Sequence, residues 1–247
     1  MSNDFIVMRP TSDFTIGEKV AKVKAIHQVL LERYGPRRWR PRLDPLSDLI
    51  YTILSQNTSD VNRDRAYERL RKKFPTWEGV RDAQVEEIAE AIRPGGLANV
   101  KAPRIKDILR TITEQRGELS LDFICQMEIE EAKEWLGSLR GVGPKTTACV
   151  LLFGCGRPAF PVDTHVYRVS KRLGLIGRKA STQEAHRILE DLLSPQDYYA
   201  FHLNLIAYGR EVCKALRPRC EICLLATYCD YLPTGSRGMR GVGDWHS

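Results

Sequence analysis

The sequence has 247 residues, of which 43% are hydrophobic and 28% are charged, a balance typical of globular proteins and sufficient for one large domain or two lobes. No stretch approaches the ~20 apolar residues that span a bilayer, and the first residues lack the basic and apolar regions of a signal peptide. We therefore expect a cytoplasmic protein, associated with the nucleoid if bacterial, and no membrane partner. The net charge of +7 favours a polyanionic partner, although a basic protein that binds no nucleic acid fits the charge equally well.

Apolar residues recur at helical spacing along most of the chain, and no segment shows the alternation of a strand. The first predicted helix starts after Thr15, which has capping-box spacing to Glu18, and it stops at Gly35-Pro36. A basic, proline-rich connector follows. Further helices are expected at about 46–54, 59–73, 83–92, 102–115, 128–138, 144–154, 164–173, 182–193 and 196–212. The predicted fold class is all-α.

Local signals mark several helix boundaries. Pro103 suits the first turn of its helix, because the N–H that proline lacks would be unpaired there. Ser181 and Glu184 have the spacing of a second capping box. Residues 1–14 and 233–247 show no helical pattern, and we expect an irregular arm and a disordered tail.

A tight turn, Gly141-Val142-Gly143, separates two of the predicted helices. Glycine reaches positive φ and leaves room at the backbone, so successive N–H groups can bind a phosphate beside the N-terminus of the next helix. Lys145 lies in the first turn of that helix, whose positive end favours the neutral, nucleophilic amine. Such an amine can attack an anomeric carbon and form a Schiff base, whereas a phosphate contact is the simpler interpretation of an isolated Gly-x-Gly-x-Lys. The context predicts a helix–hairpin–helix, which binds the DNA backbone without reading its sequence.

Asp163 directly precedes the helix expected from Thr164, and aspartate is a common N-cap. If its carboxylate faces Lys145, it would also stabilise positive charge on a sugar and assist proton transfer. The sequence alone does not establish that the two side chains meet.

Four cysteines have the spacing C-x6-C-x2-C-x5-C: Cys213, Cys220, Cys223 and Cys229. Four thiolates from one loop can bind a metal ion or a cuboidal cluster. Zinc is a common occupant of four-cysteine sites, but zinc ribbons usually pair two short C-x2-C knuckles. The single knuckle with longer arms therefore favours a [4Fe-4S] cluster. Three cations without a neighbouring acid predict a phosphate-binding loop between the first two cysteines: Lys214, Arg217 and Arg219.

Seven cysteines in an intracellular chain argue against a disulfide framework and towards metal. Cys125, Cys149 and Cys155 lie in apolar surroundings, away from the four-cysteine segment. We expect these three to be buried packing thiols.

Together these residues resemble the endonuclease III family, within the helix–hairpin–helix superfamily of DNA glycosylases. The resemblance runs from about residue 20 to 230 and rests on these motifs in order: SQNTSD, GLANVKAPRI, LRGVGPKT, VDTHVYRV, the pair His202 and Gly209, and the four-cysteine spacing. A hairpin lysine, a VDTH aspartate and this cysteine spacing form a highly specific combination. The resemblance implies two all-α lobes with DNA between them. Residues 42–157 would form a six-helix barrel that carries the hairpin, and 15–41 with 158–232 a cluster lobe.

Family members flip a damaged base out of the duplex, and the resemblance implies that Lys145 displaces this base to form a Schiff base, with β-elimination following. Wedge residues from two loops fill the vacated space, and here those loops hold Gln56-Asn57 and Leu97. Asn57 stands where endonuclease III typically has glutamine, and RPGG before Leu97 is also unusual, so the lesion and opposite-base preferences are left open. Leu97 could be a core leucine, although its Gly-Gly and Asn neighbours favour an exposed loop tip. His165 is expected at the DNA surface or, alternatively, as a polar residue in the first turn of its helix.

The predicted function is a bifunctional DNA glycosylase and abasic-site lyase that acts on oxidised pyrimidines in duplex DNA, with a monomer as the expected state. One alternative is a mismatch glycosylase that removes thymine or uracil opposite guanine. Another is a non-catalytic DNA-binding module, against which the presence of both Lys145 and Asp163 argues. Adenine glycosylases that act opposite 8-oxoguanine are disfavoured, because they generally lack the hairpin lysine and carry an extra C-terminal domain, for which no room remains after Cys229.

Overall fold

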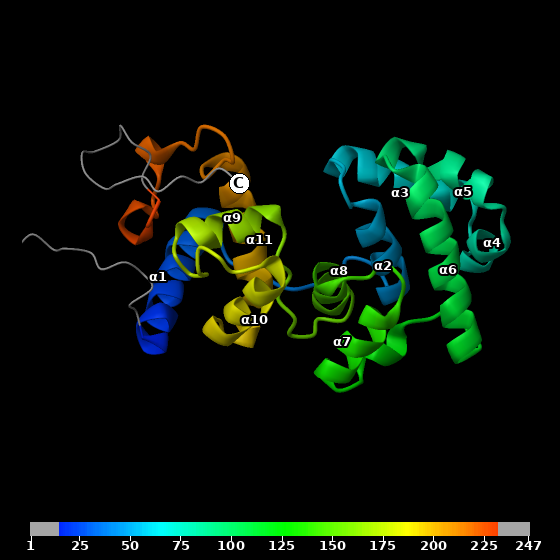
Figure 1. Ribbon diagram of the computed structural model, residues 1–247, viewed down its shortest axis with the longest axis horizontal. Coiled ribbons are helices and arrows are strands. Elements are labelled where there is room, and N and C mark those ends of the chain that lie inside the picture. The colour runs from blue at the N-terminus through cyan, green and yellow to red at the C-terminus, as the bar shows by residue number, and fades with distance from the viewer. Residues whose placement is uncertain (1–14, 232–247) are drawn as a thin grey trace, which may run out of the picture. The chain divides into compact units, whose positions relative to one another are not determined.

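The computed structural model describes residues 15–231, and every regular element in that range is a helix, which confirms the all-α class (Figure 1). The chain divides into two compact units, one of Trp39–Pro161 and one of Met1–Arg38 with Val162–Ser247. The predicted arm at 1–14 and tail at 233–247 lie outside the described residues. Within the described range, no helix has the length and apolar character needed to cross a membrane.

The unit Trp39–Pro161 is built from consecutive helices joined by short loops: α2 (Pro45–Leu54), α3 (Asp60–Lys73), α4 (Trp77–Asp82), α5 (Val85–Ile92), α6 (Ala98–Arg116), α7 (Ile129–Ser138) and α8 (Pro144–Cys149). All of these except α4 correspond to predicted helices. The six residues of α4 are too few for a clear apolar period, but Thr76 caps its first turn by accepting the N–H of Gly79 at 3.1 Å.

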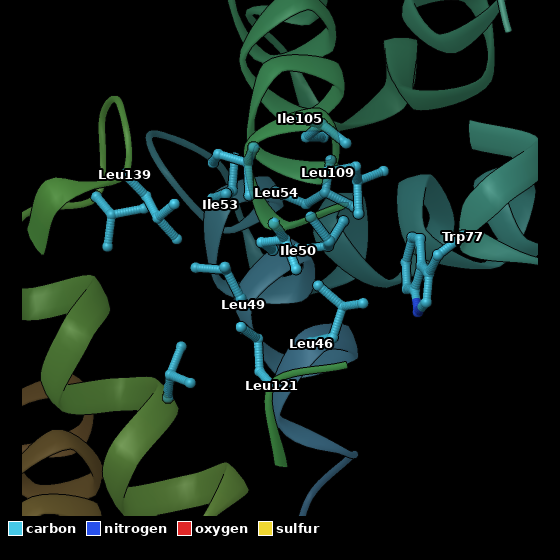
Figure 2. Packing of buried hydrophobic residues seen from close by; sticks show 14 of the residues in the cluster. Leu46, Leu49, Ile50, Ile53, Leu54, Trp77, Ile105, Leu109, Leu121 and Leu139 are labelled. Carbon is cyan, nitrogen blue, oxygen red and sulfur yellow. The ribbon is translucent and has the colours of Figure 1, made fainter. Parts of the chain in front are cut away.

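Helix α2 is the centre of this unit. Nearly all of its side chains are buried, because the sequence PLSDLIYTIL is apolar around most of the helix and α3, α6 and α8 pack against it. Figure 2 shows side chains of this core from α2, α4, α6 and the connecting segments: Leu46, Leu49, Ile50, Ile53, Leu54, Trp77, Ile105, Leu109, Leu121 and Leu139. The loop that follows α2 and the loop that precedes α6 are therefore held by a shared core.

Helix α8 continues without a break into a single wider turn, Val150–Gly154. Gly154 lies directly against the start of α2, because a Cβ at this position would come within 3.1 Å of the Cα of Pro45. Val150 and Leu151 are fully buried in the same core. The helix that carries Lys145 is thus packed against the buried core of the unit.

The start of α6 corrects one prediction. The helix begins at Ala98 and not near residue 102, so Pro103 lies inside it and not in its first turn. Proline at this position removes the bond that its N–H would make to the carbonyl of Asn99. Burial of Ala102 and Ile105 on the core side holds the helix together through this gap.

A disulfide joins Cys125 to Cys155, so the expectation that both are free packing thiols was wrong. The two residues are 30 positions apart, and no local pattern shows that their apolar neighbourhoods coincide. The link fastens the loop before α7 to the segment that follows α8, and the Arg157 guanidinium adds a hydrogen bond to the Cys125 carbonyl at 2.6 Å. Cys149 is buried and free of any disulfide, as predicted.

The other unit combines α1 with three helices from the second half of the chain: α1 (Ile16–Tyr34), α9 (Thr164–Arg172), α10 (Thr182–Leu192) and α11 (Tyr198–Glu211). Helix α11 packs against both α1 and α9, and its fully buried Phe201 and Leu205 lie in the core with Ile26 and Leu30 of α1.

Both predicted capping boxes in this unit are confirmed. The backbone N–H of Thr15 donates to Glu18, and that of Ser181 donates to Glu184, each at 2.7 Å.

Candidate functional site

The hairpin between α7 and α8 has the backbone that its glycines predict. Gly141 has a φ of 79°, in the region that favours glycine, and Gly143 is the N-cap of α8. Val142 anchors the turn: its side chain is only 5% exposed, and its N–H donates to the carbonyl of Leu139 at 3.0 Å. Lys145 is half-buried in the first turn of α8. The exposed glycines thus lie next to Lys145, and the helix that carries this lysine packs on the core.

A buried carboxylate that the sequence analysis missed lies near this lysine. Asp48, on α2, is fully buried and accepts two hydrogen bonds from the Arg42 guanidinium, at 2.6 and 2.9 Å. Burial raises the pKa of the Asp48 carboxyl above its ordinary value, and this effect outweighs the charges of Arg42 and Lys145, which lower it. The signal in the sequence was an acidic residue inside the apolar segment PLSDLIYTIL.

The two predicted wedge loops have strained backbones at their tips. Asn57 and Leu97 have φ values of 52° and 50°, which cost a residue other than glycine roughly 1 kcal/mol or more. Asn57 is exposed, and Leu97 is 51% exposed, so Leu97 is a loop tip and not a core leucine. Their contact with DNA stays a prediction.

A buried lysine connects these two loops. Lys101, on α6, is 1% exposed and donates to the carbonyls of Leu54 and Gly95, at 2.8 Å each. Leu54 ends α2 just before the Gln56-Asn57 loop, and Gly95 lies two residues before Leu97. Burial, and to a lesser extent the charge of Arg104, lowers the pKa of Lys101 to about 8.

Asp163 lies in the other unit, where it caps α9 as predicted: its Oδ1 accepts the N–H of Val166 at 2.7 Å. This bond fixes the side chain at the start of the helix. Because Asp163 and Lys145 belong to different units, their facing one another stays a prediction.

His165 is half-buried between α9 and α11. Gly209 permits this packing, since a Cβ there would lie 3.1 Å from the Cβ of His165. The Arg168 guanidinium contacts His165 Nδ1 at 3.1 Å and donates to the Gly209 carbonyl at 2.9 Å. Burial lowers the pKa of His165 below its ordinary value. The side chain therefore has a packing role, and its DNA contact stays a prediction.

The basic loop after α11 is closed at its base by the Arg219 N–H, which donates to the Val212 carbonyl at 2.9 Å. Its three cations, Lys214, Arg217 and Arg219, are all exposed, and Arg217 has a φ of 51°. The loop thus presents clustered positive charge on a strained turn, as a phosphate-binding loop would.

The four cysteines of this segment share one neighbourhood, although no group of three or more His, Cys, Asp or Glu side chains between residues 15 and 231 has the arrangement of a metal site. Burial is the main reason that the pKa of Cys229 is raised to about 12, and the three other thiols raise it further. Two sulfurs accept hydrogen bonds, Cys213 from the Arg172 guanidinium at 3.3 Å and Cys223 from the Tyr208 hydroxyl at 3.0 Å. The donor set, four neighbouring thiols with two hydrogen-bond donors, fits a thiolate-ligated cluster.

Residues 50–195, more than half of the chain, match the HhH-GPD superfamily of base excision DNA repair proteins. The chain belongs to this family. It is 32% identical to endonuclease III of Thermotoga maritima, over 87% of this chain and 96% of the relative. It is 33% identical to endonuclease III of Sulfolobus acidocaldarius, over 74% and 80% respectively. A putative DNA glycosylase of Arabidopsis thaliana is 40% identical over 66% of this chain, which spans only 55% of that protein.

Solved structures show the same fold. A trapped endonuclease III–DNA covalent intermediate superposes with a TM-score of 0.73 at 28% identity, over 88% of this chain and 96% of that one. A thermostable thymine-DNA glycosylase, at 24% identity and a TM-score of 0.71, shares the fold. Together, the family and the endonuclease III relatives support a DNA glycosylase.

Proposed function

We propose that this protein is a bifunctional DNA glycosylase that removes oxidised pyrimidines from duplex DNA and then cleaves the strand at the abasic site. The observation that carries this proposal is the half-buried Lys145 in the first turn of α8, directly after the glycine hairpin of an HhH-GPD chain. The covalent DNA intermediate trapped with an endonuclease III relative supports a covalent route.

In the proposed reaction, the hairpin binds the DNA backbone while the damaged nucleotide is flipped out of the stack. The neutral Lys145 amine attacks C1′ of the sugar, and the bond from C1′ to the base breaks with its electron pair leaving on the base, which takes up a proton. The nitrogen, positively charged after the attack, gives up one proton. The C1′–O4′ bond then breaks with its electron pair on O4′, which takes up a proton, and a protonated Schiff base forms between Nζ and C1′. Removal of a proton from C2′ then expels the 3′ phosphate, and hydrolysis of the Schiff base restores the lysine.

Asp163 has the proposed role of stabilising the positive charge that develops on the sugar when the base departs. A carboxylate held in one orientation does this without reorganisation during the reaction. The hydrogen bond to the Val166 N–H supplies that fixed orientation.

We further propose that Cys213, Cys220, Cys223 and Cys229 hold a [4Fe-4S] cluster. When bound, the cluster would supply a rigid cross-link for the basic loop and a redox-active group. This chain's own contribution would be the four thiolates, with Arg172 and Tyr208 donating to two of the sulfurs.

Borohydride trapping tests the lyase step. Wild-type protein, incubated with a duplex that contains an abasic site, should give a covalent adduct on a denaturing gel when borohydride reduces the Schiff base. Lys145→Ala should give none, whereas Lys179→Ala, which removes an exposed lysine elsewhere, should trap as well as the wild type. A wild-type protein that gives no adduct, or a Lys145→Ala variant that traps normally, contradicts the proposed mechanism.

A panel of duplexes tests the substrate. Thymine glycol and dihydrouracil should be excised faster than uracil or thymine opposite guanine. The reverse order would identify a mismatch glycosylase on the same fold.

A further inference from the structure

The segment GLANVKAPRI contributes a side chain, Arg104, that touches both the hairpin and the Gln56 loop. Its Nη1 donates to Oε1 of Gln56 at 2.9 Å. The same guanidinium lies against the exposed hairpin, because a Cβ on Gly141 would come within 2.7 Å of Cδ and Cζ of Arg104. Glycine is therefore required at 141 for this contact as well as for its positive φ.

The hydrogen bonds continue beyond Gln56 to the helix of the proposed nucleophile. Nε2 of Gln56 donates to Oγ1 of Thr146 at 3.4 Å, and Thr146 is buried next to Lys145 on α8. Gln56 thus has both ends of its amide engaged, one by α6 and one by α8. All of these groups belong to the unit Trp39–Pro161.

The charge of Arg104 has no counter-ion in the described part of the chain. Among residues 15–231, no carboxylate lies within ion-pair distance of its guanidinium. A half-buried arginine without an acid is costly unless its donors have another use. Here one donor is used on Gln56, and Nε and Cζ of the group lie against the hairpin that is proposed to bind phosphate.

We propose that Arg104 is a positioning residue, which fixes Gln56 in register with the hairpin so that both engage the same lesion. This inference rests on the proposed DNA contacts of Gln56 and the hairpin. Loss of Arg104 should leave the hairpin's hold on any duplex nearly intact, because the glycine backbone and α8 remain. It should weaken recognition of a site with a missing base, where Gln56 acts.

A double-mutant cycle tests this coupling by fluorescence anisotropy on a duplex that carries a tetrahydrofuran abasic-site analogue, with the undamaged duplex in parallel. Arg104→Met and Gln56→Ala should each weaken binding to the analogue roughly tenfold, and the double variant should be no more than about twofold weaker than the poorer single variant. Both single variants should bind undamaged duplex within about twofold of wild type. Arg110→Met is the matched control, because it removes an exposed charge from the same helix and should change neither affinity beyond about twofold.

Three outcomes overturn the inference. The effects of the two substitutions could multiply in the double variant, Arg104→Met could weaken both duplexes equally, or Arg104→Lys could restore wild-type affinity, which would make charge alone sufficient. If Arg104→Met unfolds below the assay temperature, as seen by circular dichroism, Arg104→Gln takes its place in the cycle. A wild-type protein that does not prefer the analogue would instead contradict the proposed function, which keeps the two failures distinct.

Discussion

Asp163 combines a structural and a proposed chemical role that two substitutions can separate. Asparagine caps a helix about as well as aspartate, whereas alanine does not. Asp163→Asn should therefore leave the free energy of unfolding within about 0.5 kcal/mol of wild type, and Asp163→Ala should lower it by about 1 kcal/mol. Because both remove the carboxylate, both should slow base excision by roughly 100-fold or more in single-turnover assays. If Asp163→Asn excised the base at the wild-type rate, the carboxylate would have no role in the reaction.

The buried amine of Lys101 predicts a specific pH dependence of stability. Its pKa is about 8 in the folded protein and ordinarily 10.5, so between these values the unfolded chain binds more protons and stability rises with pH. The neutral amine keeps two N–H groups, enough for the carbonyls of Leu54 and Gly95. From pH 7 to 9.5, wild type should gain about 1–2 kcal/mol relative to Lys101→Met in urea unfolding. Wild type should show no such gain relative to Lys179→Met, which changes an exposed lysine. A wild-type stability that differs from that of Lys101→Met by the same amount at every pH would contradict the prediction.

Individual residues differ in how far the sequence reveals them. Lys145 and Asp163 follow from short motifs, because a hairpin and an N-cap are local structures, and both lie where those motifs predict. Lys101 and Arg104 were not predicted, because their roles depend on the Leu54 carbonyl, Gln56 and Gly141, which lie far away in sequence. Asp48 was missed although its partner Arg42 lies only 6 positions before it. A charged residue inside an otherwise apolar helical pattern was the available signal.

At the level of elements, helices could be predicted wherever a cap and an apolar period agree, as for α1 and α10. Two helices depart from those rules. The short α4 lacks the length for a period, and α6 extends back through Pro103 because tertiary packing outweighs the lost hydrogen bond. The Cys125–Cys155 disulfide was not predicted either, since only the packing of α7 and α8 brings the two thiols together.

That disulfide should contribute measurably to the stability of its unit. A cross-link between residues 30 positions apart lowers the conformational entropy of the unfolded chain. In the loop-entropy model this raises the free energy of unfolding by about 3–4 kcal/mol. The double variant Cys125→Ser, Cys155→Ser should therefore unfold at a lower temperature than wild type, and added dithiothreitol should lower the wild-type midpoint towards that of the variant. Cys149→Ala is the control, because it removes a buried thiol that forms no disulfide and should leave the response to dithiothreitol unchanged. Identical midpoints with and without dithiothreitol would show that the bridge adds no stability.

At the level of the whole molecule, the segment 213–231 lacks the apolar core that stabilises the rest of the described chain. The unit Trp39–Pro161 has one continuous apolar core, whereas the segment 213–231 buries a single side chain, Leu225. Ordering these residues costs about 1–2 kcal/mol each in backbone entropy, which one leucine cannot offset. The cysteine spacing indicated from sequence alone that a bound group could supply the missing free energy. The division of the chain into non-contiguous units, in contrast, came from the resemblance and not from any local pattern.

The segment 213–231 should therefore depend on its cysteines for order. Purified protein should contain about four irons per chain and absorb near ~400 nm, as four cysteines with a [4Fe-4S] cluster would give. Cys213→Ser should lose iron and become sensitive to proteases within 213–231, because binding of the proposed cluster would supply the free energy that folds the segment. Cys149→Ser should keep its iron, since Cys149 is buried in the other unit. Limited proteolysis with mass spectrometry should find Trp39–Pro161 intact in both variants, whereas a colourless protein with one zinc per chain would contradict the cluster.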